Sequence, residues 1–222
     1  MEKQTTTMQK AAEAILSEMK KVIVGKDEIL KKVLMVILAG GHILLEDVPG
    51  VGKTTLALGL SKVMNLEYRR MQFTPDTLAS DITGFSVYNR ETGGLEYKPG
   101  AALCNLFLAD EINRTSAKTQ AALLEVMEER QITVDSKTYK LQEPFMVLAT
   151  QNPLESYGTY PLPEAQIDRF LIKVSIGYPS FDEEVKVVAM GKKAKQAIKA
   201  VISGQDVVRL KQDAERVYVD PM

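Results

Sequence analysis

A glycine-rich turn followed by a lysine and two threonines is the strongest chemical signal in the sequence. It reads Asp47-Val48-Pro49-Gly50-Val51-Gly52-Lys53-Thr54-Thr55. The phosphate-loop pattern is G-x-x-x-x-G-K-[ST], and every fixed position matches except the first, where aspartate replaces glycine. The two glycines let successive backbone N–H groups face one point, which makes a nest for phosphate oxygens. The turn therefore predicts a phosphate-binding site.

The lysine and the threonine of this turn suit a nucleoside triphosphate. Lys53 would reach the β- and γ-phosphates, and the Thr54 hydroxyl would ligate Mg²⁺. The helix that opens here adds the positive partial charge of its N-terminus. An ordinary glycine turn with an exposed lysine is the alternative, but a loop between a strand and a helix favours phosphate binding. Because no Asn-Lys-x-Asp guanine-reading motif occurs in the sequence, a GTPase is disfavoured.

Two adjacent carboxylates follow the apolar run 106–109. They are Asp110 and Glu111, and a buried strand would deliver them to the edge where open α/β sheets bind ligands. Asp110 can hold Mg²⁺ through water, and Glu111 can take a proton from the attacking water. A strand that simply ends in polar residues is the alternative, which the phosphate loop makes less favourable.

Two further polar residues stand beside later apolar runs. Asn152 would orient the lytic water or contact the γ-phosphate, although an ordinary Asn-Pro turn with Pro153 is an equally open interpretation. Arg169 precedes the last run, either as an ion-pair partner or as a finger that reaches the nucleotide of a neighbouring subunit. Transfer of the γ-phosphoryl group needs charge stabilisation that Lys53 and Mg²⁺ supply only in part.

The elements that must position these residues alternate between apolar runs and helical patterns. Helices are expected over 11–22 and 27–39, and the short apolar runs lie at 42–45, 68–73, 106–109, 146–150 and 170–176. Continuous apolar runs suit strands that are buried on both faces. The pattern predicts a three-layer α/β domain with a five-stranded parallel sheet.

Two hairpins and a helical tail complete the organisation. Turn residues at 89–94 predict one hairpin, and 131–134 with 138–141 predict a second. After Pro179 the strands stop, and 183–190 and 205–217 have helical patterns. The expected domains are therefore 1–179 and 180–222, with the lysine run 192–195 on a solvated helix face.

Composition excludes several classes of protein. The 222 residues carry 28 basic and 29 acidic side chains, a net charge of −1, which gives no strong nucleic-acid or membrane signal. The sequence has one cysteine, Cys104, which excludes an internal disulfide framework, and one histidine, His42, which excludes a multi-histidine metal site. Both residues are expected to be structural. The apolar runs are too short to span a membrane, and the N-terminus has no apolar export signal, so a cytoplasmic protein is expected.

Several longer strings resemble the MoxR family of AAA+ ATPases. They span about 22–220 and include the stretches 45–54, 72–76, 80–84, 108–114, 118–120, 123–125, 127–131, 149–153 and 163–170. Aspartate at position 47 is ordinary in the phosphate loops of that family. The combination of these strings is highly specific.

The resemblance implies roles for individual residues. Lys53 and Thr54 match Walker A, Asp110 and Glu111 match Walker B, Asn152 matches sensor 1, and Arg169 matches the arginine finger. The first hairpin corresponds to the helix-2 insert and the second to the hairpin before sensor 1. The candidate nucleotide-binding residues are then Val24, Gly25, Pro49, Gly50, Val51, Gly52, Lys53, Thr54, Thr55 and Asp110, with Thr54 and Asp110 at the metal.

The resemblance also implies an assembly and a function. Members form hexameric rings that remodel or mature partner complexes, often beside proteins with von Willebrand factor A domains. Their core continues into a helical lid with a sensor-2 arginine, of which we expect only the first helices here. The leading hypothesis, which the resemblance implies, is an ATPase with a chaperone-like role and with ATP or ADP and Mg²⁺ as its cofactors. The alternative is a nucleotide-dependent binding module with little or no turnover because the lid is incomplete.

Overall fold

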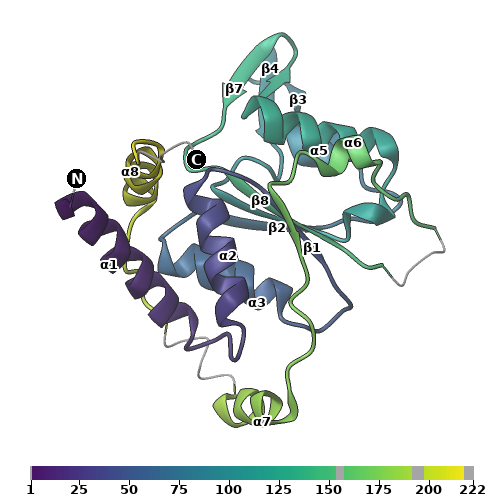
Figure 1. The fold of residues 1–222 in the computed structure, drawn as a ribbon. Helices are drawn as coiled ribbons and strands as arrows, with labels where there is room; N and C mark the ends of the chain where they lie inside the picture. The colour runs from purple at the N-terminus through teal and green to yellow at the C-terminus, as the bar shows by residue number, and fades with distance from the viewer. Residues whose placement is uncertain (1, 154–157, 192–197, 218–222) are drawn as a thin grey trace.

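A five-stranded parallel sheet forms the centre of the protein (Figure 1). The computed structural model describes residues 2–153, 158–191 and 198–217. The strand order is β2-β5-β8-β1-β9, and every neighbouring pair is parallel. The strands are β1 (Ile43–Glu46), β2 (Tyr68–Gln72), β5 (Leu106–Asp110), β8 (Met146–Gln151) and β9 (Ile172–Val174). The predicted α/β fold with a five-stranded parallel sheet is confirmed.

Helices cover both faces of this sheet, as Figure 1 shows. One layer contains α1 (Glu2–Met19), α2 (Asp27–Leu38), α3 (Lys53–Val63) and α8 (Gly204–Glu215). The other contains α5 (Ala117–Glu129) and α6 (Glu164–Ile167), and the short α4 (Ala79–Thr83) packs against α5. Alternate residues of β5 enter two separate hydrophobic clusters, Leu106 and Leu108 on the α3 side, Phe107 and Ala109 on the α5 side. This is why β5 reads as a continuous apolar run.

Only the central strands are buried on both faces. β5 is buried at every position, whereas β2 and β9 at the edges of the sheet are half-exposed. The expectation of full burial was therefore wrong for the outer runs, and 170–176 contributes only the short strand 172–174. The first helix also starts earlier than expected and ends at Met19, where backbone turns through Ile23 replace it.

Two hairpins are present, as predicted, and they lie beside the layer that contains α4 and α5 (Figure 1). They are β3 (Gly84–Asn89) with β4 (Gly94–Pro99), and β6 (Gln131–Val134) with β7 (Lys137–Lys140). Asp135 and Ser136 both have positive φ angles, 49° and 63°, which gives a two-residue turn and places Lys137 in the strand. Tyr97 of the first hairpin stacks on Tyr139 of the second with ring centroids 4.0 Å apart, so the two hairpins are in contact.

Two helices follow the last strand in the part of the chain that the structure describes. α7 (Phe181–Met190) lies at the end of the molecule opposite the hairpins (Figure 1). α8 packs against α2, and its Val207 belongs to the hydrophobic cluster on the α3 side of the sheet. The boundary near Pro179 stays a prediction, and the lysine run 192–195 lies outside the described residues. Within the ranges that the structure describes, no helix has the length and apolarity needed to cross a membrane.

His42 has a structural role, as expected. Its ring is buried, Nδ1 accepts a hydrogen bond from the Val147 N–H at 2.9 Å, and Nε2 lies 3.2 Å from the Met127 carbonyl oxygen. The ring is therefore neutral with its proton on Nε2. The pKa of His42 is lowered from 6.5 to about 4, because the effect of burial is larger than that of the hydrogen bond with Met127, which raises the pKa.

This histidine makes stability depend on pH. Below pH 6.5 the unfolded chain takes up a proton that the folded chain refuses until about pH 4, so stability falls as pH falls through this window. The loss amounts to about 3 kcal/mol once both forms are protonated. In His42→Gln, whose amide can make both hydrogen bonds without titrating, we expect a flatter dependence between pH 7 and 4. Urea unfolding across this range measures it, and parallel curves for the two proteins would contradict the assignment.

Candidate functional site

The sheet brings the predicted site residues to one edge. Glu46 at the end of β1 pairs with Gln151 of β8, and Ala109 of β5 pairs with Ala149 of the same strand. β8 therefore lies between the strand that leads into the phosphate loop and the strand that ends in the carboxylates. The carboxyl ends of parallel strands are where open α/β sheets bind ligands.

The phosphate loop has the backbone that its glycines predict. Gly50 and Gly52 have φ angles of 90° and 98°, and a β-carbon built at either would meet nothing within 4 Å. α3 begins at Lys53, directly after Gly52. The Lys53 side chain is buried and its Nζ donates to the backbone oxygen of Asp47 at 2.8 Å. The space over the two glycines is open, as a nest of N–H groups for phosphate requires, and the lysine is held by the loop itself.

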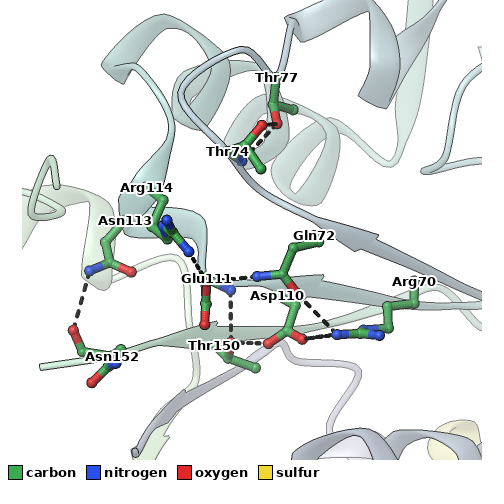
Figure 2. A network of polar contacts seen from close by, with 10 residues as sticks. All are labelled: Arg70, Gln72, Thr74, Thr77, Asp110, Glu111, Asn113, Arg114, Thr150 and Asn152. Carbon is green, nitrogen blue, oxygen red and sulfur yellow. Dashed lines mark hydrogen bonds and ion pairs between the residues drawn. The ribbon is translucent and has the colours of Figure 1, made fainter. Parts of the chain in front are cut away.

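Asp110 is buried and held from two sides. The Thr150 hydroxyl donates to Oδ1 at 2.6 Å, and Arg70 donates to Oδ2 through Nη2 at 2.7 Å and Nε at 3.2 Å (Figure 2). Arg70 points along the sheet at Asp110, because β2 is the neighbour of β5 and Gln72 pairs with Asp110.

Glu111 stands just outside the strand in a left-handed conformation, with φ 60° and ψ 51°. Its N–H donates to the Thr150 hydroxyl at 2.8 Å. Its Oε2 accepts from Gln72 Nε2 at 2.7 Å and from Arg114 Nη1 at 2.9 Å (Figure 2). Arg114 therefore pairs with the candidate general base.

Asn152 is buried beside a second asparagine that the motif analysis did not single out. The backbone oxygen of Asn152 accepts from Asn113 Nδ2 at 3.3 Å (Figure 2). The Asn113 Oδ1 atom is buried without a hydrogen-bond partner among the described residues. Asn152 is thus anchored through its main chain at the end of β8, between the phosphate loop and the carboxylates.

Arg169 lies in the turn between α6 and β9. Its guanidinium forms an ion pair with Glu128 on α5, and 41% of its side chain is exposed. The ion-pair interpretation is therefore correct for the single chain. The exposure also leaves the guanidinium accessible to a second molecule, so the finger role stays a prediction.

A pocket of about 270 Å³ adjoins the phosphate loop. Its walls come from the turn between α1 and α2, from the loop and from α7, and include Val24, Val51, Thr55, Ile176 and Val187. The walls are mainly apolar, which suits a flat base. Gly25 is not in this lining, but a β-carbon built on it would fall 1.6 Å from Oε1 of Glu183 on α7, so this turn and α7 touch.

The donor set fits ATP and Mg²⁺. The nest and Lys53 suit phosphates, and the Thr54 hydroxyl and the Asp110 carboxylate are the hard oxygen ligands that Mg²⁺ prefers. No group of three or more His, Cys, Asp or Glu side chains that could hold a metal occurs in the described ranges. An ion held here would therefore complete its shell with phosphate oxygens and water, which is how Mg²⁺ is usually bound.

Comparisons with known proteins agree with this geometry. The family model described as "ATPase family associated with various cellular activities (AAA)" matches residues 42–172. The chain is 52% identical to the protein YeaC of Bacillus subtilis over 90% of this chain and 63% of the relative, and 44% identical to Chaperone MoxR1 of Mycobacterium tuberculosis over 93% and 55%. A crystal structure from Cytophaga hutchinsonii, described as a candidate ATPase, matches with a TM-score of 0.89 at 41% identity over 99% of this chain and 67% of that chain. The chain thus spans between about half and two thirds of the length of the curated relatives.

Proposed function

The chain belongs to the MoxR family of AAA+ ATPases, and on that premise we propose that it binds ATP with Mg²⁺ and hydrolyses it at the carboxyl edge of the sheet. One observation carries the proposal. The open nest of the phosphate loop and the Asp110–Glu111 pair leave the same edge, separated by the strand that carries Asn152.

Each residue of the site has a role in this proposal. Lys53 and the N–H groups of the loop bind the β- and γ-phosphates, for which Lys53 exchanges the Asp47 oxygen for a phosphate oxygen. Thr54 and Asp110 would hold Mg²⁺, which would neutralise the charge that develops on the phosphates. Glu111 accepts the proton of the attacking water, and Asn152 orients that water. The adenine ring of the nucleotide lies in the pocket beside Val24.

The carboxylate of Glu111 can act as a base only through an oxygen that water can reach. Gln72 and Arg114 both donate to Oε2, and Oε1 makes no hydrogen bond to the residues that the structure describes. The same contacts favour a second candidate function. With Asp110 and Glu111 both held by internal donors, the chain would bind nucleotide and a partner with little turnover, and turnover distinguishes the two functions.

Assembly and cellular role extend the proposal. We place Arg169 at the nucleotide of a neighbouring subunit in a homo-oligomeric ring, with a hexamer as the expected size, because its side chain is 41% exposed. A chaperone-like role in the cytoplasm, with partners that carry von Willebrand factor A domains, follows from the family. MoxR1, a relative at 44% identity, is named a chaperone.

Calorimetric titration tests the binding step. We expect one ATP or ADP per chain in the presence of Mg²⁺, weaker binding of GTP, and unchanged ATP binding in Glu111→Gln, whose amide oxygen can still accept from Gln72 and Arg114. Failure of the folded wild-type chain to bind ATP would contradict the proposed function.

The ion pair between Arg70 and Asp110 makes a prediction about Mg²⁺. The guanidinium competes for Oδ2 of a candidate metal ligand, and 45% of its side chain is exposed. Removing it in Arg70→Met should lower the Mg²⁺ concentration that half-saturates ATP binding by about two- to fivefold, the size expected of a partly exposed pair. Arg69→Met on the same strand is the control, since Arg69 contacts Glu67 and the Gly100 oxygen instead. An unchanged or higher Mg²⁺ requirement in Arg70→Met would refute the competition.

A further inference from the structure

The aspartate at the first position of the phosphate loop makes contacts that glycine could not make. Asp47 is buried. Its Oδ1 accepts from the Ser175 hydroxyl at 2.7 Å and from the Gly177 N–H at 3.1 Å, and its Oδ2 accepts from the Ile176 N–H. Three consecutive residues after β9 therefore donate to one carboxylate. Hydrogen bonds to an ionised acceptor are about twice as strong as neutral ones.

The segment that Asp47 holds is part of the pocket wall. Ile176 and Pro179 line the pocket, and the segment leads into α7, whose Val187 and Met190 also line it. The segment is tied a second time, since Lys26 Nζ donates to the Tyr178 oxygen at 2.9 Å. One wall of the pocket is thus fastened to the phosphate loop by Asp47 and to the turn between α1 and α2 by Lys26.

The main chain of Asp47 connects the same residue to the phosphate-binding lysine. Its carbonyl oxygen accepts from Lys53 Nζ at 2.8 Å, and its N–H donates to the Gln151 oxygen of β8 at 3.2 Å. The aspartate therefore touches the lysine, the central sheet and the pocket wall together. Without its carboxylate, the buried N–H of Ile176 and the partly buried N–H of Gly177 and hydroxyl of Ser175 would lose their acceptor, which is costly above all for the buried group.

We propose that Asp47 is a positioning residue that holds the α7 wall of the pocket against the phosphate loop, so that the base and the phosphates of one nucleotide are bound together. The inference rests on the proposed function, because it assumes that the phosphates lie in the loop and the base in the pocket. Asp47 touches neither part of the nucleotide. Its loss should weaken the binding of a whole nucleotide much more than the binding of the phosphate chain.

The test compares ATP with tripolyphosphate, which has the phosphates without the nucleoside. In Asp47→Asn, one accepting oxygen becomes a donor that faces backbone N–H groups. We expect ATP affinity to fall about tenfold or more, while tripolyphosphate affinity, measured by competition, stays within about twofold of wild type. Ser175→Ala removes one donor without changing the loop and should show the same selectivity at smaller size. Asp76→Asn, at an exposed carboxylate, is the control.

The outcomes separate this inference from the proposed function. A folded wild-type chain that binds neither ligand refutes the proposed function. A wild type that binds both, with equal losses for both ligands in Asp47→Asn and Ser175→Ala or with no loss in either variant, overturns the role of Asp47 and leaves the proposed function intact. Ser175→Ala decides the matter if circular dichroism shows that Asp47→Asn does not fold.

Discussion

Lys53→Met should weaken the binding of ATP by at least about 100-fold, because the variant loses charge-assisted hydrogen bonds to two phosphates that are each worth about 1.5–3 kcal/mol. Lys53 is the first residue of α3, and its side chain is buried in the phosphate loop. Methionine keeps most of the stem of this buried side chain, so the fold should survive. Calorimetric titration with Mg²⁺ and ATP measures the effect.

Another lysine on the same helix supplies the control for this result. Lys62 lies in the last turn of α3 and is exposed. Lys62→Met changes the same charge on the same helix and should bind ATP as the wild type does. Equal losses in the two variants would mean that Lys53 acts only through the overall charge, which would contradict the phosphate-loop assignment.

Arg169→Ala and Glu111→Gln should each lower ATP turnover by at least about 100-fold, and mixing the two should restore it in part. If Arg169 acts on a neighbour's nucleotide, a site needs the glutamate of one subunit and the arginine of the next. In randomly mixed rings with head-to-tail interfaces, about a quarter of the sites would have both. Phosphate release measured after the variants are mixed and allowed to exchange gives the answer.

The mixing experiment has its own control in an exposed arginine. Arg209 on α8 has 72% of its side chain exposed and pairs only loosely with Asp206, at 3.6 Å. Arg209→Ala should be active alone and unaffected by mixing. A mixture of Arg169→Ala and Glu111→Gln that shows no more activity than the sum of its components would contradict the shared site.

Local pattern was enough to predict the sheet and the phosphate loop. Central strands that are buried on both faces must be apolar on both faces, so 106–109 and 146–150 could be recognised in the sequence as continuous apolar runs. The glycines of the loop are required by φ angles near +90°, which other residues rarely adopt. Both features depend on residues that are close together in the sequence, and they can therefore be predicted from it.

Contacts between distant segments could not be predicted in the same way. Asp47 accepts from residues 128 to 130 positions away, and Arg70 reaches Asp110 across 40 positions. These pairings follow from the strand order, which no local pattern contains. The one available signal was the aspartate itself, because a charged side chain at a position that usually has glycine needs a partner when it is buried.

The edge strands were misjudged for a related reason. β2 begins Tyr68-Arg69-Arg70, and the run 68–73 was expected to be buried on both faces like a central strand, whereas no residue of β2 is fully buried. An edge strand is bonded on one side, so its polar side chains can turn along the sheet to the neighbouring strand, where Arg70 meets Asp110 and Gln72 meets Glu111.

The decisive experiment is steady-state phosphate release from ATP with Mg²⁺, measured over a range of chain concentrations beside Glu111→Gln. We predict turnover whose specific activity rises with concentration, as a site shared between subunits requires, and the loss of this turnover in Glu111→Gln while ATP stays bound. ATP that binds without turnover at every concentration, or equal turnover by the two proteins, would contradict it.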